Sequence, residues 1–85
     1  MLTAEACRAG RALLGWGLED LAGASGVAAG TLSRIENGRT MRAGTMKKLV
    51  DAFGANGVEI VKTEDRTGAV LIYARRTAFA GDTKK

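Results

Sequence analysis

The chain has 85 residues and a formal net charge of +4, with 13 lysines and arginines, 9 aspartates and glutamates, no histidine and one cysteine. This length predicts one small domain, close to the size at which a single hydrophobic core is just sufficient for stability. The excess of basic residues favours a polyanionic partner. A single cysteine without histidine excludes an intrachain disulfide and a zinc site. The sequence has no apolar run of about 20 residues and no signal-peptide pattern, so we expect no membrane partner and a cytoplasmic location.

The first predicted helix begins after Thr3, a residue suited to capping, and ends at Gly15. Cys7, Arg11 and Leu14 fall on one face of this helix. An arginine on an inward face must reach solvent or find a carboxylate, because an unpaired buried charge is costly. Cys7 on the same face is better interpreted as a small core residue than as a reactive thiol.

Residues 18–35 predict two short helices joined by a tight turn, a helix-turn-helix. Gly26 lies at the corner, where the chain usually needs a positive φ that glycine adopts at least cost. Ala22, four residues earlier, is small enough to let the two helix axes approach closely. The apolar residues recur at helical spacing and are expected to fill one shared cluster. They are Leu21, Val27, Leu32 and Ile35.

The second helix of this pair is expected over residues 29–37, and Glu36 near its end is the natural partner for Arg11. We therefore predict a partly buried ion pair between these two side chains. A basic loop follows over residues 39–44, and a fourth helix over residues 44–54 turns its apolar face to the core.

After residue 57 the apolar period changes from helical to alternating. Residues 58–62 and 69–74 therefore predict the two strands of a β-hairpin, joined by the polar segment 63–68. Both strands are apolar on both faces, so one face can pack on the helices. The other face, or the free edge of the hairpin, either holds a second subunit in a strand-mediated dimer, or the hairpin only covers the helical core. The residues that would contact a second subunit are Val61, Leu71 and Tyr73.

Residues 11–53 resemble the Xre or Cro/repressor-type (lambda-repressor-like) helix-turn-helix domain of bacterial and phage regulators. The resemblance rests on residues 11–16, 21–22, 25–27, 31–33 and 35–38. In this family the arginine at the position of Arg11 pairs with the glutamate at the position of Glu36, in agreement with the pair argued from charge burial.

The expected fold class is mostly α, with a four- to five-helix repressor-like helix-turn-helix domain followed by a C-terminal β-hairpin. The helix-turn-helix domain would occupy residues 1–57 and the hairpin residues 58–75. Residues 76–85 are expected to form a flexible tail.

The resemblance also implies that residues 29–37 form a recognition helix, which lies in the major groove of DNA. Residues in the following loop would then contact the DNA backbone and supply salt-dependent affinity. The base-reading residues would be Ala29, Gly30, Ser33 and Arg34. The residues close to the DNA backbone would be Thr31, Arg39, Thr40 and Arg42. The alternative for Arg39 and Arg42 is a plain solvated loop.

Three positions depart from the usual pattern of the family. Ala29 and Gly30 replace polar side chains and cannot donate hydrogen bonds, although Ala29 can touch a thymine methyl group. Arg34 is therefore the main candidate for direct readout, through a bidentate contact to guanine worth about 1–3 kcal/mol of discrimination. Leu18 stands where many members have a glutamine that contacts phosphate, so this chain lacks the side chain for that contact.

These features predict a sequence-specific, double-stranded DNA-binding transcriptional regulator that binds an inverted repeat as a homodimer and regulates its own promoter. By resemblance its setting is a bacterial or phage genome, such as a mobile element, a restriction-modification system or an antitoxin operon. The alternative is an antitoxin-like interaction module whose hairpin holds a protein partner. An enzyme is the least favoured class, because the sequence has no histidine and we find no nucleophile paired with a general base. We therefore expect no catalytic residue, and we expect no cofactor and no metal.

Overall fold

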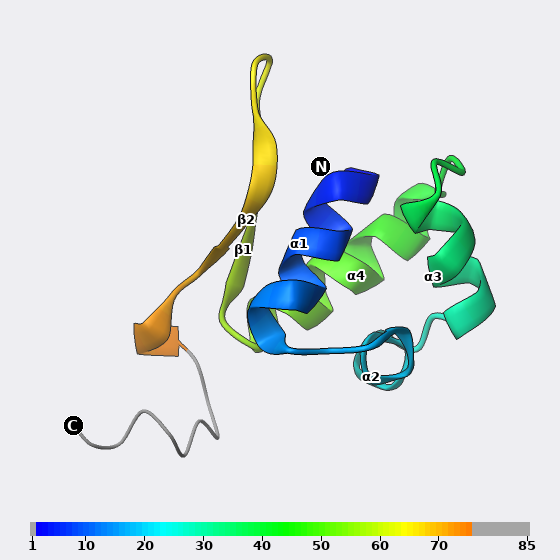
Figure 1. Ribbon diagram of the computed structural model, residues 1–85, viewed down its shortest axis with the longest axis horizontal. Helices are drawn as coiled ribbons and strands as arrows, with labels where there is room; N and C mark the ends of the chain where they lie inside the picture. The colour runs from blue at the N-terminus through cyan, green and yellow to red at the C-terminus, as the bar shows by residue number, and fades with distance from the viewer. Residues whose placement is uncertain (1, 76–85) are drawn as a thin grey trace.

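Four helices and a β-hairpin form the fold in the computed structural model, which describes residues 2–75 (Figure 1). The elements in chain order are the helices α1 (Ala4–Leu14), α2 (Leu18–Ser25), α3 (Ala29–Glu36) and α4 (Ala43–Ala55), the strands β1 (Val58–Lys62) and β2 (Thr67–Leu71), and the 3-10 turn η1 (Tyr73–Arg75). The prediction of a mostly α fold with a C-terminal hairpin is therefore confirmed. The tail expected over residues 76–85 lies outside the described residues.

Local hydrogen bonds and the left-handed glycines Gly15 and Gly26 set the ends of the first two helices. The side-chain oxygen of Thr3 accepts a hydrogen bond of 3.1 Å from a first-turn N–H and so caps α1. Gly26 ends α2 at the predicted corner with a φ of 79°, in the left-handed region. The hydroxyl of Ser25 supports the corner, since it donates to the carbonyl of Leu21 at 2.7 Å and accepts from the N–H of Val27 at 3.1 Å.

One core joins the four helices to the hairpin. The apolar residues predicted to fill a shared cluster are all buried in it, namely Leu21, Val27, Leu32 and Ile35. Phe53 from α4 is fully buried, and its ring lies directly against the backbone of α1 at Gly10. The rings of Phe53 and Trp16 stack with their centroids 6.4 Å apart. The core therefore holds the buried face of α3 inward and leaves its opposite face at the surface.

The hairpin lies beside α1, on the side of the molecule away from α3 (Figure 1). Its strands pair antiparallel, with Val58 opposite Leu71. Val58 is 1% exposed, and Ile60, Ala69 and Leu71 pack against the core beside it. Because side chains alternate between the faces of a strand, the outer face carries the others. These are Glu59, Val61, Gly68 and Val70.

Three details of the predicted hairpin are wrong. Strand β2 begins two residues earlier than predicted, because a backbone hydrogen bond of 2.8 Å from Thr63 to Arg66 closes the loop. The strand ends at Leu71, and Tyr73 lies in η1. The register turns Leu71 toward the helices, so Leu71 is not on the outer face assigned to a second subunit. Val70, which is 48% exposed, is on that face instead.

Candidate nucleic-acid interface

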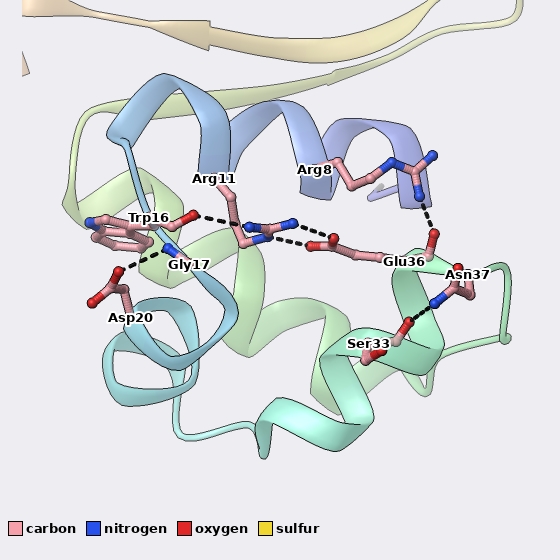
Figure 2. Close-up of polar contacts among 8 residues, drawn as sticks. All are labelled: Arg8, Arg11, Trp16, Gly17, Asp20, Ser33, Glu36 and Asn37. Atoms are coloured by element: carbon pink, nitrogen blue, oxygen red, sulfur yellow. Dashed lines mark hydrogen bonds and ion pairs between the residues drawn. The ribbon is translucent and has the colours of Figure 1, made fainter.

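An ion pair between α1 and α3 fixes the C-terminal end of the expected recognition helix (Figure 2). Arg11 donates from Nε and Nη2 to the two carboxylate oxygens of Glu36, both at 2.7 Å. A third donor of Arg11, Nη1, bonds to the carbonyl of Trp16 at 3.0 Å. Glu36 is only 6% exposed, so this is the partly buried pair expected from the sequence. The bidentate geometry fixes both the position and the rotation of α3 at this end.

The pair also sets the protonation of the buried groups around it. Burial alone would raise the pKa of Glu36, but the hydrogen bonds and charge of Arg11 outweigh it and hold the pKa of this carboxyl below its ordinary value. The hydrogen bond to Glu36 raises the pKa of Arg11. Burial, with the nearby Glu36, raises the pKa of the Cys7 thiol to about 12. Cys7 is fully buried and protonated at neutral pH, as a core residue would be.

Arg8 is a second contact from α1 to α3 that the sequence analysis missed. Its guanidinium donates to the backbone carbonyl of Glu36, one of the unpaired carbonyls at the end of α3 (Figure 2). Arg8 comes three residues before Arg11 and so shares its side of α1. That spacing is the one signal in the sequence that could have identified it.

The expected base-reading residues form a stripe along the surface of α3. Leu32 and Ile35 are buried on one side of this helix, and the stripe runs along the other. Gly30 and Arg34 are exposed, and Ala29 and Ser33 are half-buried. A Cβ atom added at Gly30 would meet nothing closer than a guanidinium nitrogen of Arg34 at 3.9 Å, so the backbone there is open to a partner.

The end of α3 and the loop after it enclose a hollow of about 310 Å³. We call it the arginine hollow, and its lining residues are Thr31, Arg34, Ile35, Arg39, Thr40, Met41, Arg42 and Thr45. It brings together five of the eight residues expected to contact DNA. Ala29, Gly30 and Ser33 do not line it. Met41 and Thr45 do, although the sequence analysis did not assign them to the site.

Three positive charges surround the arginine hollow. Within residues 2–75, Arg34, Arg39 and Arg42 are exposed and make no ion pair, and no acidic side chain lines the hollow. Arg42 also precedes the first turn of α4, where no side chain caps the helix. Free backbone N–H groups at a helix N-terminus favour anions. The hollow can therefore bind phosphate oxygens and present Arg34 beside them.

The N-terminus of α2 is not suited to phosphate. The carboxylate of Asp20 accepts a hydrogen bond of 2.8 Å from the N–H of Gly17, so that donor is already occupied (Figure 2). Glu19 adds a second negative charge in the same turn. Leu18 packs against the core. This end of α2 therefore offers neither a side-chain donor nor a positive potential to a DNA backbone.

A family model described as a helix-turn-helix domain matches residues 4–61. The match covers all four helices and reaches into β1. No curated protein and no solved structure gives a significant match. In the described part of the chain, no helix has the length and apolar character needed to cross a membrane. Residues 2–75 also contain no group of three or more histidine, cysteine or acidic side chains placed to hold a metal ion.

Proposed function

Because this chain belongs to the helix-turn-helix domain family, we propose that it is a sequence-specific, double-stranded DNA-binding transcriptional regulator. It acts as a homodimer on an inverted repeat and regulates its own promoter. The single observation that supports this most is the arginine hollow, where an exposed arginine of α3 lies beside two further arginines of the next loop. One surface thus carries both a group able to read bases and groups able to bind phosphates.

In this proposal α3 enters the major groove with its exposed stripe toward the bases. Arg34 donates two hydrogen bonds to O6 and N7 of a guanine. Ala29 contacts a thymine methyl group, and Gly30 lets the helix backbone come close to the duplex. Ser33 lies on the same stripe and offers a hydroxyl to a neighbouring base.

The loop after α3 positions the protein on the DNA backbone. Arg39 and Arg42, which line the arginine hollow, bind phosphates, and the hydroxyls of Thr31 and Thr40 donate further hydrogen bonds to the DNA backbone. One α3 covers only a few base pairs with small side chains, so useful specificity requires two half-sites, about 34 Å apart. This is the reason for proposing a homodimer.

A second candidate function is an antitoxin-like interaction module whose hairpin holds a protein partner. The small side chains of Ala29 and Gly30 favour it because they read bases poorly. The exposure of Val70 and Tyr73 on and after the hairpin also favours it. The unpaired arginines around the hollow oppose it.

The test is a selection of bound sequences from a randomised duplex library, followed by anisotropy titrations at two salt concentrations. We expect wild type to select an inverted repeat. Arg34→Ala should lose about 10- to 100-fold of discrimination at one base pair in each half-site while keeping the salt dependence of binding. Arg39→Ala and Arg42→Ala should keep the preference and each lower the salt slope by about 1.

Arg66→Ala is the matched control, since Arg66 is an exposed arginine at the hairpin loop that pairs with its neighbour Asp65. Arg66→Ala should change neither the sequence preference nor the salt dependence of DNA binding. If wild type selects no sequence from the library, the regulator proposal fails and the interaction module becomes the better account.

A further inference from the structure

Strand β2 has one edge without a strand partner. The sheet contains two strands among the described residues, so each has a second edge. Backbone bonds join Ile72 to Gly57 and Thr63 to Arg66, and pairing alternates along an antiparallel ladder. The backbone groups that point away from β1 are therefore those of Thr67, Ala69 and Leu71.

This edge also lacks the features that usually protect an exposed strand. Natural edge strands carry charges, prolines or bulges that prevent pairing with another chain. Strand β1 carries Glu59 and Lys62, whereas residues 67–74 contain no charged residue and no proline. The exposed large apolar side chains of the described residues include Val70 at 48% and Tyr73 at 65%. The unprotected edge and the exposed apolar groups thus lie on the same strand and the turn after it.

We propose that the free edge of β2 pairs antiparallel with the same edge of a second copy of this chain, giving a four-stranded sheet in the order β1-β2-β2-β1. When the two-fold axis passes beside Ala69, all five residues of β2 pair with residues of the other β2. Ala69 then faces Ala69 of the other copy, and Val70 faces Gly68, which has no side chain to obstruct it. Thr67 faces Leu71 on the inner side.

The free edge of β2 is complementary to itself, and for this reason we propose a second copy of the chain as its partner. In the proposed register no charged side chain faces another across the new contact. The same operation applied to β1 would place Lys62 beside the buried Val58 of the other copy, which is unfavourable. The assignment rests on the proposed function, since an inverted repeat needs two recognition helices. The hairpin lies on the side of α1 away from α3, so pairing through it leaves both proposed recognition helices free (Figure 1).

The first test is the dimer dissociation constant of the full chain, measured by sedimentation equilibrium. We expect wild type to dimerise and Val70→Lys to raise the dissociation constant at least tenfold, because a lysine would lie at the centre of the new sheet. Glu59→Lys is the matched control, since Glu59 is the cross-strand neighbour of Val70 on the same face but belongs to β1. It should change the constant less than threefold, and circular dichroism confirms that both variants fold.

The second test places a thiol at the contact. In the proposed register the two Val70 side chains are diagonal neighbours, about 7–8 Å apart. A short bis-maleimide should therefore cross-link Val70→Cys into a covalent dimer. It should leave Glu59→Cys uncross-linked, because two further strands separate the two copies of that residue. Cys7 does not interfere, since it is fully buried and its thiol pKa is raised to about 12.

The outcomes separate this surface from the proposed function. A wild-type monomer, or a dimer that survives Val70→Lys without cross-linking at Val70→Cys, overturns the β2 contact. If Arg34-dependent sequence preference is measured in that case, DNA recognition stands without it. Conversely, cross-linking at Val70→Cys in a protein that selects no DNA sequence supports the surface and defeats the regulator proposal.

Discussion

Glu36 is the residue on which two contacts from α1 converge. Arg11 binds its carboxylate and Arg8 its carbonyl, so the side chain and backbone of one residue attach α3 to the rest of the core. Removing one member of a buried pair leaves the other charge without compensation. A substitution at Glu36 therefore affects both stability and the position of α3.

We expect Glu36→Gln to lower the free energy of unfolding by about 2–4 kcal/mol at pH 7. The folded-state pKa of Glu36 is lowered, so its contribution to stability is present above the ordinary value of 4.5 and is lost as the pH falls through the folded pKa. The difference in unfolding free energy between wild type and Glu36→Gln should shrink when the pH falls from 7 to about 3. Urea unfolding followed by Trp16 fluorescence measures this difference at each pH.

Glu64→Gln, in the exposed hairpin loop, serves as the control and should change little at either pH. A Glu36→Gln penalty of equal size at both pH values would mean that the carboxylate charge does not stabilise the fold.

At the scale of the elements, two glycines in helices have opposite roles. A Cβ atom at Gly10 of α1 would lie 2.7 Å from the ring of the buried Phe53, so Gly10→Ala should force α1 and α4 apart. We expect a loss of about 1–3 kcal/mol in unfolding free energy. A Cβ atom at Gly23 of α2 would meet nothing within 4 Å, and Gly23→Ala should stabilise by about 0.5–1 kcal/mol through helix propensity. Thermal unfolding followed by circular dichroism compares the two variants. Equal changes in stability for Gly10→Ala and Gly23→Ala would contradict the close contact between α1 and α4 at Gly10.

The helices could be predicted from the sequence because their signals are local. Thr3, Gly15 and Gly26 mark helix ends within a few residues of the chain, and the apolar period marks the buried faces. The hairpin was less predictable, because the polar Thr67 and the flexible Gly68 are typical of a loop. A loop shorter by two residues changes which residues pair but keeps each side chain on its face, because the side-chain period of a strand is two. Val70 faces outward because it pairs with Glu59, and Leu71 faces inward because it pairs with the buried Val58.

The candidate site was predictable in part through the resemblance to a known family. Arg34 and the arginines of the next loop are assigned because they stand at positions where members of that family contact DNA. That they line one hollow together with Met41 and Thr45 depends on how the loop folds back over α3, which no local pattern encodes. Arg8 was missed because its partner is a backbone carbonyl, and a backbone carbonyl has no signature in the sequence.

At the scale of the whole molecule, the hairpin belongs to the same core as the helices. Val58 of β1 is 1% exposed and lies in a cluster with residues from α1, α2, α3 and α4. We expect Val58→Ala to lower the free energy of unfolding by about 2 kcal/mol through the cavity it leaves. The transitions seen by Trp16 fluorescence and by far-ultraviolet circular dichroism should move together. A hairpin that unfolds separately, with the Trp16 transition unchanged, would contradict a shared core.

The two ends of α3 are held in different ways. Charged contacts from α1 secure its last residue, whereas it begins after Ala28, whose side chain makes no capping bond. Within residues 2–75, the first-turn amides of Ala29 and Gly30 have no hydrogen-bond acceptor. An oxygen of a docked duplex can supply the missing acceptor. In the proposed function, DNA would then complete the hydrogen bonding of the helix proposed to read it.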